Sequence, residues 1–309
     1  MKKLLFALLC SIGMTASAQA ETIGISMSLF DDNFLTILRK KMMSHIGTKD
    51  GVKARAEDAQ GDISRQQSQI ENFIASGVDG IIVQLVDADS GVAISKTAQR
   101  AGVPLIFVNQ LPTGIENLPK GQAYVGSDEI QAGLLQADFI CKTLKGKGNV
   151  VVIQGGLGTN GQRGRTKGVH EGFTKEGCKG IKIIEEQSAN WFRMNALDLM
   201  TNWLSAGFKF DAVASNNDEM ALGAIQAMKA ASIFMDKVIV AGVDGTPDAL
   251  AAIKAGDLDA SVFQNAEGQG IQAVDAILKL VNGENVDKII NIPFEPITKE
   301  NFKEYINRN

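Results

Sequence analysis

The alternation of apolar, strand-like runs with amphipathic helical patterns is the feature that most restricts the fold of this chain. In SRQQSQIENFIASG, for example, Ile70, Phe73 and Ile74 recur at helical spacing before Gly77. Strands that alternate with helices form parallel sheets covered by helices on both faces. The strand-like runs are Thr22–Met27, Val52–Glu57, Gly80–Leu85, Pro104–Asn109, Asn149–Gln154, Ile181–Glu186, Ala212–Ser215, Val238–Val243 and Ala260–Phe263. So many strands exceed one ordinary sheet, and we predict an α/β protein with two doubly wound lobes.

The first twenty residues are typical of a secretory signal peptide. A basic start, MKK, precedes an apolar run over residues 4–14 and the small-x-small sequence AQA at 18–20. The run is too short for a membrane anchor, which needs about 20 apolar residues. We therefore expect cleavage after Ala20 and export of the remaining chain to the periplasm.

Charge and composition argue against nucleic acid and against catalysis. Loss of Lys2 and Lys3 leaves 29 basic and 35 acidic residues, a net charge of −6, whereas nucleic acid requires a basic face. The two histidines, His45 and His170, form no zinc-ligand spacing with a cysteine, and no Gly-x-Ser-x-Gly sequence occurs. We expect a protein that is no enzyme and that needs no metal or cofactor.

Cys141 and Cys178 are the cysteines that remain after cleavage. In an exported protein, two cysteines predict a disulfide. Two buried free thiols are the alternative.

Polar and aromatic side chains follow nearly every predicted strand. In open α/β sheets, ligands bind beyond the carboxyl ends of the strands, so residues directly after the apolar runs are the candidates. These are Ser28, Asp32, Phe34, Gln84, Asn109, Trp191, Asn216, Asn217, Asp244 and Gln264, with the glycine-rich stretch GGLGTNGQRGR. Each alone is typical of a cap or a turn. Together they predict a cleft between the lobes that is rich in planar hydrogen-bonding groups.

The stretch SLFDDNFL, residues 28–35, indicates the class of ligand. Asp31 or Asp32 could cap the following helix, but a cap accounts for only one of the two carboxylates. Carboxylates beside aromatic faces suit sugars and polyols, because hydroxyl groups donate to the carboxylate and the C–H face of the ring packs on the aromatic plane. We therefore expect Phe34 and Trp191 to sandwich the ring of a small polyol or sugar.

A competing motif, Gly156-Leu-Gly158-Thr-Asn-Gly161, matches the G-x-G-x-x-G pattern of dinucleotide-binding proteins. It follows a predicted strand, which keeps a nucleotide-dependent oxidoreductase as a distant alternative. Arg163 and Arg165 follow it at once, and no catalytic His or Tyr accompanies it. A flexible loop that turns into the cleft is the simpler interpretation.

The stretches SNNDEMALGAIQAMKAA (215–231) and VAGVDGTPDAL (240–250) resemble the signature stretches of periplasmic sugar-binding proteins of ABC importers. The ribose- and galactose/glucose-binding proteins are similar in pattern over essentially all of Glu21–Asn309. FDDNFLTILR, GDISRQQSQIENFIASGVDGIIV and QSANWFR are still more similar to the inositol- and rhizopine-binding branch.

The resemblance implies two Rossmann-like lobes joined by a three-stranded hinge, which close on the ligand. The implied crossovers lie near Ser127–Asp128, Gln264–Asn265 and Phe294–Glu295. We therefore expect a signal peptide at 1–20, an N-terminal lobe formed by 21–127 plus 265–294, and a C-terminal lobe formed by 128–264 plus 295–309.

The resemblance also implies which side chains bind the ligand. Arg165, rather than the nearby Arg163, resembles the family's ligand-binding arginine. Phe34 and Trp191 resemble its stacking aromatic residues. Asp32 resembles the family's carboxylate or amide that binds ring hydroxyls. The other implied ligand-binding residues are Gln84, Asn109, Asn217, Asp244 and Gln264.

Departures from the resemblance narrow the choice of ligand. Thr159 and Gly161 stand where the galactose/glucose branch has a His and an Asp, and Leu35 and Gln110 stand where the ribose branch has a Phe and an Arg. The galactose/glucose branch also has a calcium-binding loop rich in carboxylates. The stretch CKTLKGKGN has no acidic residue, so we expect no such calcium site. The first choice is myo-inositol, with a ribose- or galactose-type monosaccharide or rhizopine as alternatives.

The implied partners are a membrane permease with its ATPase, and a chemoreceptor is a second candidate. Sugar-responsive repressors share the two-lobe fold, but they need a basic helix-turn-helix segment where this chain has its signal-like start. We expect a monomer.

Overall fold

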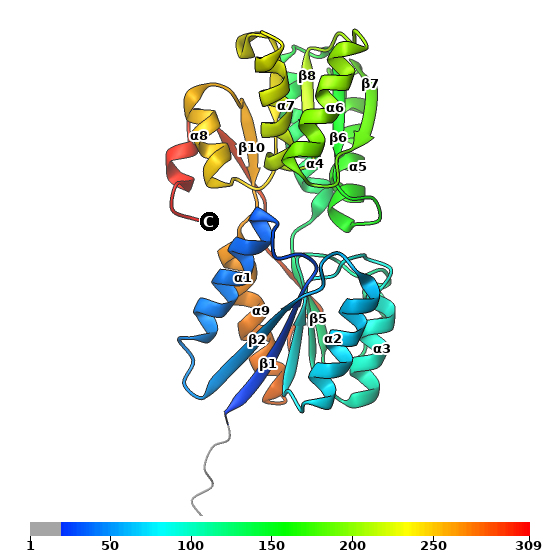
Figure 1. The fold of residues 1–309 in the computed structure, drawn as a ribbon, viewed down its shortest axis with the longest axis vertical. Coiled ribbons are helices and arrows are strands. Elements are labelled where there is room, and N and C mark those ends of the chain that lie inside the picture. Colours follow the sequence, from blue (N-terminus) through cyan, green and yellow to red (C-terminus); the bar gives the residue numbers. More distant parts are fainter. Residues whose placement is uncertain (1–19) are drawn as a thin grey trace, which may run out of the picture.

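The computed structural model describes residues 20–309, which form two α/β lobes stacked along the long axis of the molecule (Figure 1). The predicted signal peptide lies outside the described residues, apart from Ala20. Within residues 20–309, no helix combines the length and the apolar character needed to cross a membrane.

The sheet of the first lobe is parallel throughout. Its strands, from edge to edge, are β11 (Ile289–Asn291), β5 (Gln122–Gly126), β4 (Leu105–Val108), β3 (Gly80–Val83), β1 (Glu21–Met27) and β2 (Val52–Asp58). Strand β1 lies between β3 and β2, so the order reverses there and the loops after β1 and β3 diverge. Such a reversal is where open α/β sheets bind ligands.

Helices cover both faces of this sheet (Figure 1). Four helices form two pairs, one on each face of the sheet, and each pair covers its own buried core. The first pair is α1 (Asn33–Ile46) with α9 (Ala266–Val281), and the second is α2 (Ile63–Ala75) with α3 (Gly91–Ala101). A short 3₁₀ helix, η1, spans Ile115–Asn117.

The second lobe repeats the arrangement with one difference, an antiparallel edge strand. Its strands, from edge to edge, are β12 (Glu295–Thr298), β10 (Ala260–Phe263), β9 (Ile239–Ala241), β8 (Ala212–Ser215), β6 (Lys147–Gln154) and β7 (Gly180–Ser188). Strand β12 is the antiparallel one, because the chain re-enters this lobe from the first.

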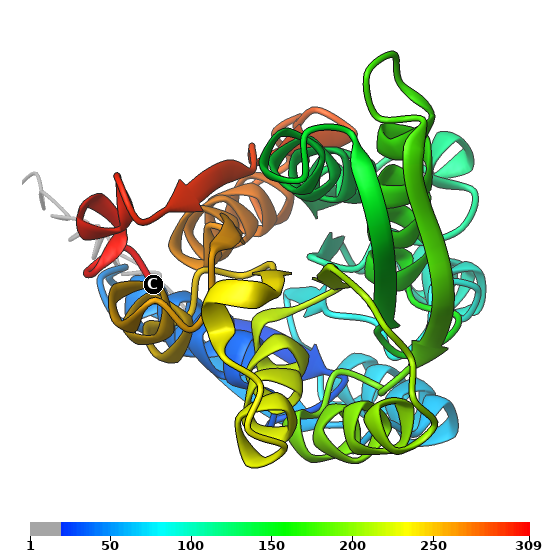
Figure 2. The ribbon, with the colours of Figure 1, turned by 90° about the horizontal axis from the view of Figure 1, so that it is seen from above.

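The helices of the second lobe also lie on both sides of the sheet (Figure 2). They are α4 (Glu129–Thr143) and α5 (Asn160–Thr174) on one face, and α6 (Arg193–Ser205), α7 (Asp218–Ala230) and α8 (Pro247–Ala255) on the other, with 3₁₀ helices η2 (Met235–Lys237) and η3 (Phe302–Tyr305). Local signals set their ends. For example, Thr246 caps α8, Pro247 is its first residue, and Gly256 ends it with a left-handed φ of 80°.

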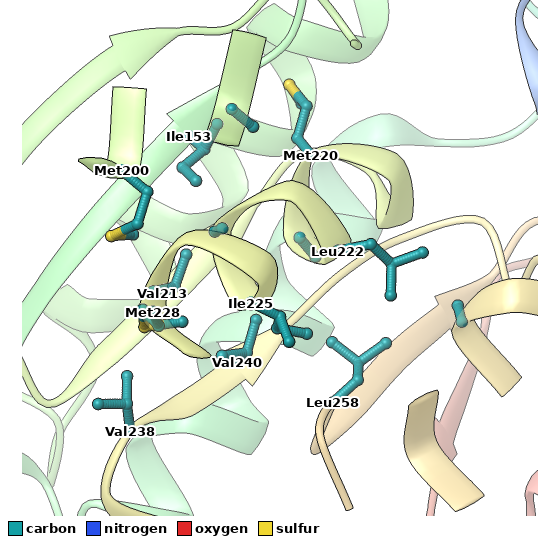
Figure 3. Close-up of a cluster of buried hydrophobic side chains, with 14 of the residues drawn as sticks. Ile153, Met200, Val213, Met220, Leu222, Ile225, Met228, Val238, Val240 and Leu258 are labelled. Atoms are coloured by element: carbon teal, nitrogen blue, oxygen red, sulfur yellow. The ribbon is translucent and has the colours of Figure 1, made fainter. Parts of the chain in front are cut away.

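The core beneath α6, α7 and α8 combines aliphatic and methionine side chains, some of which Figure 3 shows, with aromatic ones such as Trp203 and Phe263. Ile225 and Met228, three residues apart on α7, lie beside Val240 and Val213 of the sheet. This face of α7 is buried in the core. The packing fixes the position of the helix, and with it the position of its N-cap, Asn217.

Cys141 and Cys178 form a disulfide, with Cα atoms 5.6 Å apart. The bond joins the last turn of α4 to the loop before β7.

The chain passes between the lobes three times. We call these segments the first, second and third crossing: 127–128 between β5 and α4, 264–265 between β10 and α9, and 292–294 between β11 and β12.

The structure corrects the strand predictions. It adds β5, β11 and β12, and it ends three strands earlier than expected, at Val83, Val108 and Ala241. Strands β11 and β12 were missed because they are partly exposed edge strands of only three and four residues. Strand β5, QAYVG, is completely buried, but its terminal Gln and Gly hide the pattern.

Candidate ligand-binding site

A cavity of about 470 Å³ lies between the lobes, where the carboxyl ends of the two sheets face each other. Its size is that of an ordinary small-molecule pocket. All nine predicted ligand-binding residues line it: Asp32, Phe34, Gln84 and Asn109 from the first lobe, Arg165, Trp191, Asn217 and Asp244 from the second, and Gln264 at the second crossing.

Arg165 is the central cation of the cavity, and its guanidinium group is held by four protein groups. Nε donates to Glu129 Oε2 at 2.6 Å, and Nη2 donates to Gln264 Oε1 at 3.0 Å. Nη1 donates to the carbonyl oxygen of Asn216 at 2.7 Å and lies 3.5 Å from Asp244 Oδ1. The side chain is only 6% exposed. Arg165 therefore organises the second-lobe wall as well as facing the cavity.

Carboxylates outnumber cations at the cavity surface. Asp32, Glu129 and Asp244 line it, and Arg165 is the guanidinium among the lining residues. Burial raises the pKa of Asp244 well above its ordinary value, and Arg165 opposes that shift. Burial also raises the pKa of Asp32. A ligand group that donates hydrogen bonds or carries positive charge would favour the ionised form of these carboxyls.

Asp32 combines the two roles considered for SLFDDNFL. It is the N-cap of α1, with Oδ1 accepting a hydrogen bond from the Leu35 N–H at 2.8 Å, and it also lines the cavity. One carboxylate oxygen therefore holds the helix, while the group remains available to hydroxyls. Asp31 is exposed and lies outside the cavity lining.

Other amides of the site are oriented by protein contacts. Asn217 caps α7 by accepting from the Met220 N–H at 3.0 Å, and its Nδ2 donates to the Trp191 carbonyl at 3.2 Å. Gln84 Oε1 accepts from the Ser28 N–H at 3.0 Å. Such contacts leave each amide with a defined direction before ligand arrives.

Several lining residues have left-handed or otherwise unusual backbones. The φ angles are 65° for Asn109, 53° for Asn190, 74° for Trp191 and 127° for Asp244. Non-glycine residues rarely adopt positive φ, and such strain persists where the surroundings over-determine it. The clustering of these residues at one cavity supports a binding role for it.

The glycine-rich loop makes room for Trp191. A Cβ atom on Gly155 would lie 2.1 Å from the indole, and one on Gly156 or Gly161 would lie 3.0 Å or 3.3 Å from it. The indole therefore rests on the loop, in the place where a phosphate would approach a dinucleotide-binding loop.

Phe34 and Arg163 differ from the other aromatic and basic candidates. Phe34 is 5% exposed and belongs to the apolar core with Leu38, although it also lines the cavity. Arg163 is exposed and pairs with Asp89 of the first lobe at 3.3 Å, at the rim of the cleft.

Sequence reasoning missed Glu129 and the apolar part of the lining. Glu129 follows the first crossing and is the first residue of α4, where no apolar run marks it. The apolar lining includes Leu85, Leu157 and Phe192. Leu157 and Phe192 lie in loops, where an apolar residue carries no periodic signal.

A second buried carboxyl group, that of Asp218, holds the residues that directly follow Asp244. Asp218, on α7, accepts from Ser261 Oγ at 2.7 Å and from the N–H groups of Gly245 and Thr246 at 2.7 Å and 3.1 Å. It thereby fixes the turn that follows Asp244. Burial raises the pKa of Asp218 to about 7, against the effect of these donors.

Titration of Asp218 predicts a measurable pH dependence of stability. The raised pKa means that protonation stabilises the fold fully below about pH 4, and that this contribution disappears as pH rises to about 7. Asp218→Asn cannot titrate. The unfolding free energy of the wild type minus that of the variant should therefore fall by about 2 kcal/mol between pH 5 and pH 7 in urea denaturation. A constant difference would show that the three donors keep the carboxylate ionised throughout.

The sequence matches a known protein family and known relatives. The model of the periplasmic binding protein domain matches residues 23–285. A protein of Rhizobium meliloti named as a candidate rhizopine-binding protein is 53% identical over the full length of both chains.

Two solved structures are similar in fold and sequence. An ABC transporter solute-binding protein from Bacillus halodurans, with bound myo-inositol, has a TM-score of 0.88 and 39% identity, over 96% of this chain and all of that one. The Caulobacter myo-inositol-binding protein, bound to myo-inositol, has a TM-score of 0.86 and 30% identity, over 94% of this chain and 96% of that one.

Proposed function

The chain belongs to the periplasmic binding protein family, and from this premise we propose that it captures a cyclic polyol, with myo-inositol as first choice, and delivers it to an ABC importer. The cavity between the lobes carries the proposal, because its nine predicted side chains come from both lobes and converge on one space. The two similar structures with bound myo-inositol support the choice of ligand.

The chemistry of the lining suits a ring that bears many hydroxyl groups. Asp32 and Asp244 accept from hydroxyls, and Asn109 and Gln264 both donate and accept. Trp191 offers an indole face to the C–H surface of the ring. These groups suit ligand binding, and membership of the periplasmic binding protein family supports our proposal of a receptor rather than an enzyme.

A polyol that carries a protonated amine is the second candidate, and a charge imbalance favours it. Glu129 already engages Arg165 at 2.6 Å, whereas Asp32 accepts only from main-chain N–H groups. An ammonium group near Asp32 would gain a charge-assisted hydrogen bond that a hydroxyl cannot match. The 53% identity to the candidate rhizopine-binding protein keeps rhizopine itself as an alternative. Ribose- and galactose-type sugars remain weaker alternatives.

The glycine loop gives the oxidoreductase alternative little support. Trp191 covers the loop, and a dinucleotide would have to displace the indole to reach the N-terminus of α5.

Direct contacts between the lobes support closure around the ligand. Asn33 Nδ2 donates to Glu219 Oε1 at 2.8 Å, and the Asn160 N–H donates to Gln110 Oε1 at 3.1 Å. We propose that the lobes, 21–127 plus 265–294 and 128–264 plus 295–309, move about the three crossings. Ligand then favours the closed state by the contacts that it makes with both lobes.

The remaining assignments follow from the family and stay proposals. We propose that the signal-like start is cleaved on export, that a permease with its ATPase recognises the closed form, and that the protein is monomeric. A chemoreceptor is a further candidate partner.

A thermal-shift titration of residues 21–309 tests the function. The panel is myo-inositol, scyllo-inositol, an inositol with one amino group, galactose, glucose, ribose and NAD. A ligand at 100 times its Kd should add about 2.7 kcal/mol of stability, which raises Tm by several degrees. We expect a shift with myo-inositol. A larger shift with the amine would favour the second candidate, a shift with ribose or galactose would overturn the choice of ligand, and a shift with NAD alone would overturn the receptor.

A further inference from the structure

We propose that Asn309 is a positioning residue for the ligand-binding side chains of Asp244 and Gln264, and that it acts through their main chain. The inference rests on the proposed role of the cavity as the ligand site. Asn309 is half-buried and lies outside the cavity lining, so any effect on the ligand is indirect. Figure 1 shows that the end of the chain lies at the level where the two lobes meet.

The carboxamide of Asn309 makes three hydrogen bonds, all to main-chain groups. Nδ2 donates to the carbonyl oxygens of Asp244 at 3.1 Å and Gln264 at 2.9 Å. Oδ1 accepts from the N–H of Ala266 at 3.0 Å. One side chain thus joins the main chain at two ligand-binding residues to the first turn of α9.

The main chain at Asp244 requires this support. Its φ angle of 127° is strained for a residue with a side chain. Its N–H donates to Val262 O at 2.8 Å, and its carbonyl accepts from the Gln264 N–H at 3.1 Å. Asn309 adds a second donor to the same carbonyl. The orientation of the Asp244 carboxylate toward Arg165 depends on that backbone remaining in place.

Asn309 also spans the second crossing. Gln264 leaves the second lobe, and Ala266 is the first residue of α9 in the first lobe. The N–H groups in the first turn of a helix have no partner within that helix, and Asn309 Oδ1 supplies one. The contact therefore fixes the direction in which the chain enters the first lobe.

Arg308 anchors the tail that carries Asn309. Its Nη1 and Nη2 donate to the two carboxylate oxygens of Glu295 at 2.8 Å and 2.5 Å. Its guanidinium carbon lies 4.4 Å from the ring centroid of Phe263 and 4.9 Å from that of Tyr305. Phe263 precedes the second crossing and Glu295 follows the third. The tail is consequently fixed to the second lobe without help from the ligand.

The test compares Asn309→Ala and Asn309→Asp with Asn307→Ala, a change at an exposed asparagine two positions earlier. The ligand is the panel polyol that binds the wild type. Asn309→Ala should raise Kd about tenfold, mainly through faster dissociation. Stopped-flow fluorescence of Trp191 measures the dissociation, because the other tryptophan, Trp203, is buried in the second-lobe core. Asn307→Ala should behave as the wild type.

Asn309→Asp separates positioning from helix capping. The carboxylate can still accept from Ala266 N–H, but it places negative charge against the carbonyls of Asp244 and Gln264. Its Kd should rise at least as much as that of Asn309→Ala. Unchanged Kd and dissociation rate in both folded variants, with or without a lower Tm, would overturn the inference. A wild type that binds no panel member would overturn the proposed function, and the inference with it.

Discussion

Replacing Arg165 with alanine should weaken binding of the polyol by about 30-fold or more and lower the free energy of unfolding by about 3–5 kcal/mol. The change removes the cation from between Glu129 and Asp244, whose side chains are 3% and 5% exposed. Both carboxylates then lie in a buried site without a positive partner, so the pKa of Asp244 rises further. A ligand hydroxyl that accepts from the guanidinium also loses its donor, at a cost to binding of about 2–5 kcal/mol.

Urea denaturation and titration calorimetry check the two effects, and two variants serve as controls. Arg165→Lys keeps the charge but cannot supply the Nε, Nη1 and Nη2 donors together, so binding should weaken while most of the stability remains. Arg163→Ala removes an exposed arginine from the same helix and should change both measurements little. If Arg163→Ala were as damaging as Arg165→Ala, the assignment of the two arginines would be wrong.

The general fold could be predicted because parallel strands buried on both faces leave continuous apolar runs. Strands such as β3 and β8 consist of buried aliphatic residues and small ones, bounded by polar turns. The sequence did not reveal β11 and β12, because each is stabilised by one neighbouring strand at a sheet edge. Their position depends on how the chain passes between the lobes, which local patterns do not encode.

Much of the cavity lining could be predicted for a related reason. Asn217 and Asp244 lie two and three residues beyond the ends of the buried strands β8 and β9, and parallel topology brings such residues to one edge of the sheet. Glu129 and Asn309 could not be found in this way. Glu129 faces the cavity because of the direction in which α4 leaves the first crossing. Asn309 reaches the second crossing from a tail with no apolar pattern.

Removing the disulfide should destabilise the protein strongly without changing the cavity. Cys141 and Cys178 are 37 residues apart, and a loop of that length corresponds to about 4 kcal/mol of stabilisation in the chain-entropy model. The double variant Cys141→Ser/Cys178→Ser should show that loss in urea denaturation. The wild type measured in a reducing agent should approach the same value. An equal midpoint for oxidised and reduced protein would contradict the prediction.

The effect of this variant on binding should be small, because the disulfide and the cavity lie at opposite ends of α4. Glu129 begins the helix at the cavity, whereas Cys141 lies in its last turn, about 18 Å further along the axis. The folded double variant should therefore bind the polyol with a Kd within about twofold of the wild-type Kd, as measured by titration calorimetry. Arg165→Ala, by contrast, should lose both stability and binding. A large loss of affinity in the cysteine variant would mean that the far end of α4 controls the position of Glu129, and hence of Arg165.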